Sequence, residues 1–165
     1  MWQLAAVVLL AAYAAHFGRW SSPPSEDAAM LMRYAAHLGA GEGIVWNVGQ
    51  PPVDGATDFL FMVLVGSMVR LGLPLEAATR SLSLIAHALT LGLLTVVFYQ
   101  QAMPRWLASV AILFVGMGGG LFYAEAFFGT PLFALLALGA WIAALRLRDH
   151  PQDRRSAWLS GVCRC

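Results

Sequence analysis

The stretch SLSLIAHALTLGLLTVVFY, Ser81–Tyr99, decides the fold class because it contains no Asp, Glu, Lys or Arg. At about 1.5 Å of rise per helical residue, it is long enough to cross a bilayer core of about 30 Å. Three other apolar stretches come close to the same length, namely Trp2–Phe17, Trp106–Tyr123 and Pro131–Leu145. The sequence therefore predicts an all-α polytopic membrane helix bundle. The expected transmembrane spans number about four and cover residues 1–20, 81–99, 106–123 and 131–147.

The composition agrees with a chain that lies mostly in a membrane. Only 12% of the 165 residues are charged, against about 25% in soluble domains, and the mean hydropathy is +0.68. The formal net charge of +1 excludes a strongly basic protein that binds nucleic acid. Cys163 and Cys165 form a C-x-C pair with no second pair, so we predict neither a metal site nor a disulfide framework.

Residues 1–20 have two interpretations. Ala12-Tyr13-Ala14 follows an apolar run in the small-x-small pattern of a signal-peptide cleavage site, but no basic residue precedes that run. We favour an uncleaved first span over a cleaved signal peptide. Both interpretations place the chain after Arg19 on the outer side of the membrane.

The arginines predict the orientation of the spans, because short loops rich in Lys or Arg stay on the cytoplasmic side. Arg146–Arg155 carries four of them, so residues 148–165 are expected to form a cytoplasmic tail. Counting back through three spans places Ser81 at the outer face. Residues 21–80 then form one long external loop.

The apolar run Phe59–Val69 is too short for a comfortable span, so we expect an interfacial helix over residues 58–70. Counting this run as a fifth span would put the arginine-rich segment outside. Arg70 and Arg80 are the feature that favours the five-span alternative, because they could mark an internal loop.

A second interfacial helix is expected over residues 26–38. Ser25 is a favourable N-cap, and Gly39 is expected to end the helix. Residues at helical spacing give the helix one apolar face, which we expect to lie on the membrane. These residues are Leu31, Tyr34, Ala35 and Leu38.

The segment from Ser21 to Asp58 holds five of the nine carboxylates and is the part that resembles a site. Glu26 and Asp27 occupy a first helical turn, where capping and the helix dipole alone explain them, at about 0.3–1 kcal/mol. A carboxylate at the membrane surface is also suited to act as a general base. The alternating glycines that follow lack the G-K-[ST] ending of a phosphate-binding loop, and Asp54-Gly55 predicts a tight turn.

The run EDAAMLMRYAAHLGAGEGIVWNVGQPPVDGATDFLFMVL, Glu26–Leu64, resembles the first external loop of GT-C-type membrane glycosyltransferases. The similarity is to the bacterial branch that includes arabinofuranosyl- and mannosyltransferase-like proteins. Gly129–Arg148 resembles the start of that family's next outside-to-inside span. The matching positions of the loop are Glu26, Asp27, Arg33, Tyr34, Ala35, Gly41, Gly43, Val45, Asn47, Gly49, Val53, Gly55 and Thr57.

This resemblance implies an inverting transferase that moves a sugar from a polyprenyl-phosphate donor to an acceptor hydroxyl of a glycan or lipid. By the resemblance, Asp27 would be the general base, with Glu26 beside it as the second catalytic residue. Arg33 would pair with the donor phosphate or a carboxylate, and snorkelling to the lipid headgroups is an equal alternative. Glu76 would lie outside, near Asp27, as a further substrate-binding acid or as a solvated loop acid.

The resemblance also implies a bacterial inner (cytoplasmic) membrane, with the catalytic loop facing the periplasm or exterior. The expected partners are membrane lipid, the lipid-linked sugar and the acceptor, with no nucleic acid. It implies no cofactor apart from the polyprenyl-phosphate-linked sugar, and a divalent metal requirement stays open.

The chain departs from the family pattern in two places. Family members commonly carry an acid immediately before the Thr-Pro-Leu-Phe run, where this chain has Gly129; Glu125, one helical turn earlier, is the proposed substitute. GT-C enzymes also have a larger bundle, and Ser156–Leu159 resembles the start of another span. We therefore interpret the chain as an N-terminal portion with a truncated tail.

Two other function classes stay open. A non-catalytic small integral membrane assembly or scaffold protein would pack through the run Gly116–Gly120, because small residues allow close approach of helices. A transporter fragment is disfavoured, because His87 is the one ionisable residue deep within the long apolar stretches.

Overall fold

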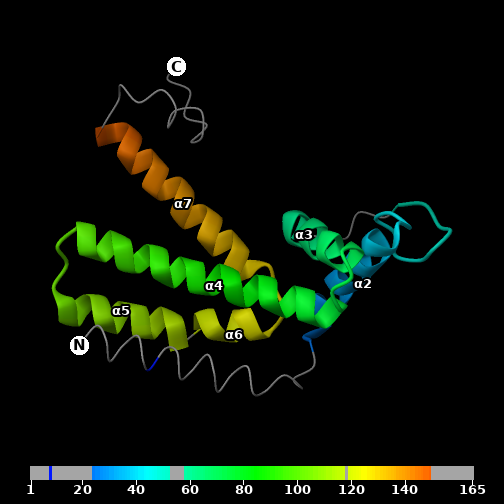
Figure 1. The fold of residues 1–165 in the computed structure, drawn as a ribbon, viewed down its shortest axis with the longest axis horizontal. Coiled ribbons are helices and arrows are strands. Elements are labelled where there is room, and N and C mark those ends of the chain that lie inside the picture. The colour runs from blue at the N-terminus through cyan, green and yellow to red at the C-terminus, as the bar shows by residue number, and fades with distance from the viewer. Residues whose placement is uncertain (1–7, 9–23, 53–57, 118, 150–165) are drawn as a thin grey trace.

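The computed structural model describes residues 8, 24–52, 58–117 and 119–149, and it is all-helical over these residues, without strands (Figure 1). Its helices are α2 (Glu26–Ala40), α3 (Phe59–Arg70), α4 (Leu75–Gln100), α5 (Arg105–Met117), α6 (Gly119–Glu125) and α7 (Thr130–Asp149).

Three helical segments are long and apolar enough to cross a membrane, namely Leu75–Gln100, Arg105–Glu125 and Thr130–Arg148. The all-α prediction is confirmed for the described residues, and each of these segments contains or closely overlaps one predicted span. Apart from Val8, the first expected span, residues 1–20, lies outside the described residues, as does most of the expected tail.

The helix α4 is longer than the sequence predicted. It begins at Leu75, directly after Pro74, and its 26 residues rise about 39 Å, more than the bilayer core requires. The helix therefore begins six residues before the predicted span of residues 81–99. Glu76 and Arg80, which were expected in the external loop, belong to the first two turns of α4.

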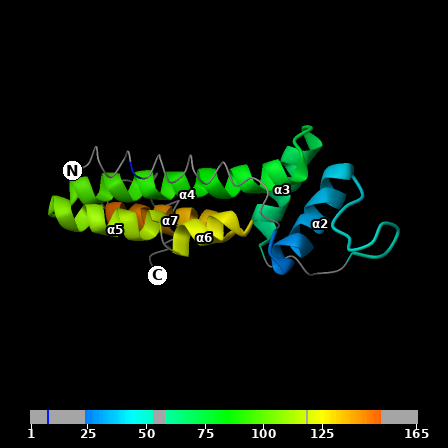
Figure 2. The same ribbon diagram turned by 90° about the horizontal axis from the view of Figure 1, so that it is seen from below.

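The long helices lie alongside one another, and α2 and α3 form a separate pair at one end. In Figure 1, α5 and α6 follow one side of α4, whereas α7 diverges from the N-terminal half of α4. Figure 2 shows α2 and α3 beyond the N-terminal end of α4, where they run across the direction of the long helices. This is the arrangement that two helices along a membrane surface would need.

The apolar face of α2 packs against α3. The shared core consists of Leu31, Tyr34, Ala35, Phe61, Met62, Val65 and Ala78. The expectation that this face lies on the membrane is therefore wrong, because α3 presents an apolar face of its own and the two faces bury each other.

Two glycines allow α2 and α3 to approach closely. A Cβ atom on Gly66 would lie 3.0 Å from the carbonyl oxygen of Ala35, and one on Gly39 would lie 2.8 Å from Cγ1 of Val69. The sequence predicted that Gly39 ends the helix, and this prediction is wrong. The helix continues to Ala40, and Gly41 takes the left-handed conformation, with φ of 86°, that closes it.

The other end of α2 follows the prediction. Ser25 is the N-cap, and its hydroxyl accepts a hydrogen bond from the backbone N–H of Ala28 at 3.4 Å. Glu26 and Asp27 therefore occupy the first helical turn, as expected.

A glycine contact also joins α4 to α6. His87 is 3% exposed and forms a hydrogen bond with the backbone of Gly116, and a Cβ on Gly120 would lie 2.6 Å from Cε1 of His87. The scaffold hypothesis assigned the glycines of this segment to helix packing. One of them, Gly120, makes its close contact with a helix of the same chain.

We predict that Gly66→Ala destabilises the protein by about 1–3 kcal/mol, because the added methyl group meets the backbone of α2. Gly92→Ala is the matched control, since a Cβ there meets no atom within 4 Å. Thermal unfolding in a mild detergent, followed by circular dichroism, measures both. Equal midpoints for the two variants would contradict the close α2–α3 packing.

Candidate functional site

The N-terminus of α2 lies against the short segment that links α6 to α7. The Ser25 hydroxyl donates a hydrogen bond to the carbonyl of Ala126 at 3.2 Å, and Ala28 and Phe127 belong to one buried cluster. The exposed acids Glu26 and Asp27 are therefore placed beside this linker.

The same contacts bring two further predicted acids to this end of the bundle. Glu125 is the last residue of α6 and directly precedes the linker. Glu76 lies in the first turn of α4, and its neighbour Leu75 packs against the cluster of Ala28 and Phe127. The structure thus gathers the helix ends that carry four of the five predicted site residues, although they are spread widely along the sequence.

Arg33 points instead toward the glycine-rich loop. Its Nε donates to the carbonyl of Trp46 at 2.9 Å, its Nη2 donates to Oδ1 of Asn47 at 2.8 Å, and its guanidinium lies 4.4 Å from the Trp46 ring centre. Within the described residues, these contacts give Arg33 an anchoring role and no carboxylate partner. Its predicted contact with a donor phosphate stays a prediction.

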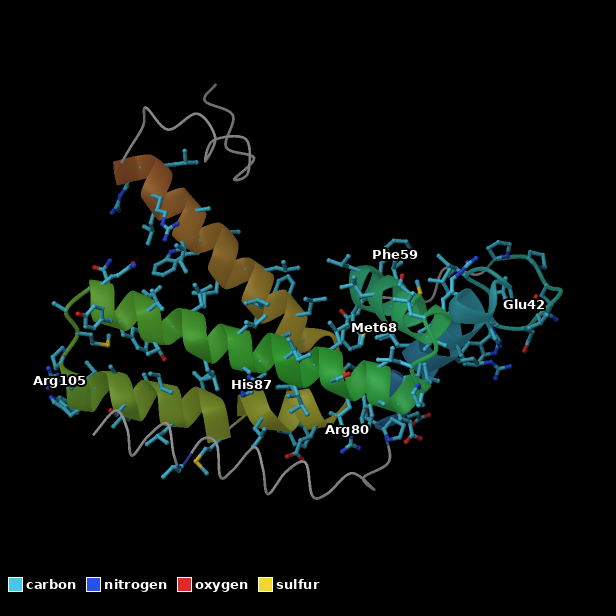
Figure 3. The ribbon with its side chains drawn as sticks, in the orientation of Figure 1. Glu42, Phe59, Met68, Arg80, His87 and Arg105 are labelled. Carbon is cyan, nitrogen blue, oxygen red and sulfur yellow. The ribbon has the colours of Figure 1, made fainter. Side chains whose placement is uncertain are left out.

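The loop after α2 is held against that helix by polar contacts. The carbonyl of Val45 lies 2.8 Å from Nδ1 of His37, and the Asn47 amide donates to Oε1 of Gln50 at 2.8 Å. Figure 3 shows Glu42 at the outer part of this loop, away from Arg80 and His87 on α4. The motif residues Val53, Gly55 and Thr57, and the predicted turn at Asp54-Gly55, lie outside the described residues.

Arg80 lies beside the linker between α6 and α7, although it was not among the predicted site residues. Its side chain is 2% exposed, and the guanidinium lies 4.6 Å from the centre of the Phe127 ring. The signal was present: buried polar residues recur along one face of α4, at Arg80, Ser83, His87 and Thr90. That spacing, close to 3.6 residues, indicates an inward-facing stripe, but the predicted span began one residue too late to include Arg80.

The linker is fixed from α4 as well as from α2. The Ser83 hydroxyl donates to the carbonyl of Phe128 at 3.1 Å. Phe127 is fully buried and has φ of 64°, a left-handed conformation that is unfavourable for a bulky residue unless its surroundings enforce it. Packing thus holds the linker in one conformation between the predicted acids.

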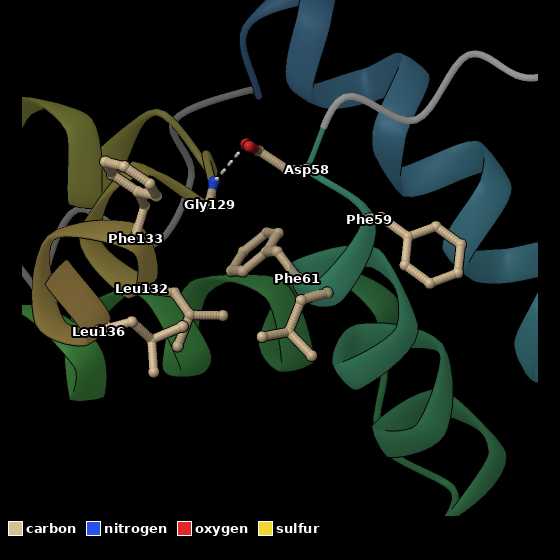
Figure 4. Close-up of a pocket in the computed structure, with 8 residues that line it drawn as sticks. Asp58, Phe59, Phe61, Gly129, Leu132, Phe133 and Leu136 are labelled. Carbon is tan, nitrogen blue, oxygen red and sulfur yellow. Dashed lines mark hydrogen bonds between the residues drawn. The ribbon is translucent and has the colours of Figure 1, made fainter. Parts of the chain in front are cut away.

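Asp58, immediately before α3, is the second residue that the sequence analysis missed. The backbone N–H of Gly129 donates to its Oδ2 at 3.2 Å (Figure 4). A Cβ on Gly129 would lie 2.8 Å from this oxygen. The structure thus places a carboxylate beside Gly129, where the family pattern would have an acid. The predicted substitution by Glu125 stays a prediction.

A pocket of about 330 Å³ opens beside Asp58, between α3 and α7. Apart from the carboxylate and the backbone of Gly129, its walls are apolar side chains (Figure 4). The lining residues are Asp58, Phe59, Leu60, Phe61, Gly129, Leu132, Phe133 and Leu136.

Comparison of the chain with protein-family models, with curated proteins and with solved structures found no match. Among the described residues, no group of three or more His, Cys, Asp or Glu side chains is arranged to hold a metal ion.

We predict that Arg33→Lys loosens the glycine-rich loop, because lysine cannot form the paired hydrogen bonds or stack its whole head group on Trp46. Hydrogen–deuterium exchange should become faster across residues 43–50. Arg70→Lys, at the exposed end of α3, is the control and should leave that exchange unchanged. Equal exchange in both variants would show that Arg33 does not anchor the loop.

Proposed function

We propose that this chain is the N-terminal part of an inverting GT-C-type glycosyltransferase. It would move a sugar from a polyprenyl-phosphate donor to an acceptor hydroxyl at the outer membrane face. The observation that carries the proposal is the exposed first turn of α2, which bears Asp27 and begins where Ser25 and Ala28 contact the linker. The sequence motif from Glu26 to Leu64, whose residues follow in the same order as in that family, supports the same assignment.

In the proposed reaction, the Asp27 carboxylate accepts the proton of the acceptor hydroxyl as its oxygen attacks the anomeric carbon. The bond between that carbon and the phosphate oxygen breaks, and polyprenyl phosphate leaves with the bonding electrons. A base for this step must be within hydrogen-bond reach of the hydroxyl, and an exposed carboxylate at a helix start is free to approach it. Glu26 would act beside Asp27 as the second catalytic acid, and Glu76 and Glu125 would bind substrate hydroxyls.

The proposed location is a bacterial inner membrane, with the start of α4 at the outer face. Leu75–Arg80 extends α4 beyond the length that a bilayer core needs, so these residues would lie in the interface. Arg146 and Arg148 at the end of α7 would then lie on the cytoplasmic side.

A non-catalytic assembly protein is the second candidate, and one observation favours it. Only 6% of the residues in the 18-residue apolar stretch of α7 are buried within the chain. This helix is therefore open to lipid or to another membrane subunit. An assembly role predicts that the acids at the start of α2 are dispensable.

We predict that Asp27→Asn lowers sugar transfer about a hundredfold or more, because the variant keeps the shape of the side chain but cannot accept the proton. The assay uses protein in liposomes with radiolabelled polyprenyl-phosphate mannose or arabinose and measures label in glycan and glycolipid. Glu42→Gln, an exposed acid in the glycine-rich loop, is the control and should retain transfer.

Two results would contradict this proposal in different ways. Loss of transfer in Glu26→Gln with full activity in Asp27→Asn would move the base to Glu26. No transfer from either donor by an unsubstituted full-length version of the protein would remove the transferase proposal and leave the assembly role.

The orientation gives a separate prediction. In a background with Cys163→Ser and Cys165→Ser, Glu76→Cys should react with a membrane-impermeant maleimide applied to intact cells. Gln101→Cys, in the exposed turn between α4 and α5, should react only after permeabilisation. The opposite labelling pattern would reverse the orientation and restore an internal position for Arg80.

A further inference from the structure

The pocket between α3 and α7, called here the α3–α7 groove, has no assigned ligand. Its walls include side chains that are largely open, with Phe59 57%, Phe133 71% and Leu136 50% exposed. On the other side, Phe61 and Leu132 continue into the α2–α3 core, so the floor of the groove is fixed by packing. The groove is thus an open apolar pocket whose inner wall is packed against the α2–α3 core.

Apolar walls alone would not select a ligand in a membrane, because lipid chains cover apolar surface equally well. Selection must therefore come from the polar group in the groove. Among the residues that line it, that group is the half-buried Asp58 carboxylate, at the N-terminal end of α7.

The Asp58 carboxylate retains capacity to accept hydrogen bonds. A carboxylate has two oxygens with about four acceptor positions, and the contact described for Asp58 is one bond from the Gly129 N–H. The positive end of the α7 dipole, equivalent to about half a charge, offsets part of the negative charge. A neutral donor such as a hydroxyl is therefore sufficient as a partner, whereas a phosphate beside Asp58 would be repelled.

We propose that the α3–α7 groove binds an amphiphile whose hydrocarbon chain lies along Phe61, Leu132 and Leu136 and whose uncharged head donates a hydroxyl to Asp58. The groove and the start of α2 flank the same linker, since Ser25 bonds to Ala126 and Asp58 bonds to Gly129. A hydroxyl-bearing lipid would thus be held close to the end of the bundle that carries the predicted acids. The binding proposal does not depend on sugar transfer, so the two can fail separately.

The test uses the protein in phosphatidylcholine nanodiscs with a dodecyl glucoside that carries a diazirine in its chain. After irradiation, peptide mass spectrometry should locate adducts on the groove residues of α3 and α7. Unlabelled dodecyl glucoside should compete about tenfold better than dodecyl phosphate, a difference of about 1.4 kcal/mol. Asp58→Asn keeps an acceptor for Gly129 but removes the charge, so the discrimination against dodecyl phosphate should disappear.

A second pair of variants tests the groove itself. Leu136→Trp fills the groove and should remove labelling of the opposite wall, whereas Ala137→Trp, exposed on α7 and outside the groove, should leave it intact. Equal labelling in both variants, or equal competition by dodecyl phosphate in the unsubstituted protein, would overturn the proposal. Stronger competition by dodecylamine than by the glucoside would also overturn it, in favour of a cationic head.

Discussion

The contact between Arg80 and Phe127 is the constraint on which the rest of the described structure depends. A buried guanidinium is costly to desolvate, and an aromatic face offers partial compensation through the cation–π interaction, here at 4.6 Å. The ring can lie there because Phe127 takes a left-handed backbone conformation. The buried guanidinium and the left-handed residue are therefore in contact at one point between α4 and α7.

The linker that contains Phe127 determines where two other elements begin. Ser25 bonds to Ala126 and so fixes the start of α2, whereas Asp58 bonds to Gly129 and so joins the start of α3 to the start of α7. Ser83 holds the middle of the linker from α4. Four consecutive residues thus position both the predicted acids and the α3–α7 groove.

The elements that the sequence predicted well are those with a local cause. Hydropathy located most of each long helix, and Ser25 marked the start of α2, because both depend on adjacent residues. The apolar face of α2 was found, but periodicity cannot distinguish lipid from a protein partner, so its packing against α3 was missed. The roles of Gly39 and Gly41 were confused for the same reason: only the partner helix shows which glycine is needed for close approach.

The missed site residues depend on contacts between distant parts of the chain. Asp58 and Gly129 lie 71 positions apart, and neither has a local pattern that indicates the other. Because the carboxylate reaches α7 from α3, its position depends on how α3 packs on α2, and hence on Gly66 and Gly39. An acid carried by α7 itself would be independent of that packing. In this chain the placement of a charged group in the groove is therefore coupled to the folding of the α2–α3 pair.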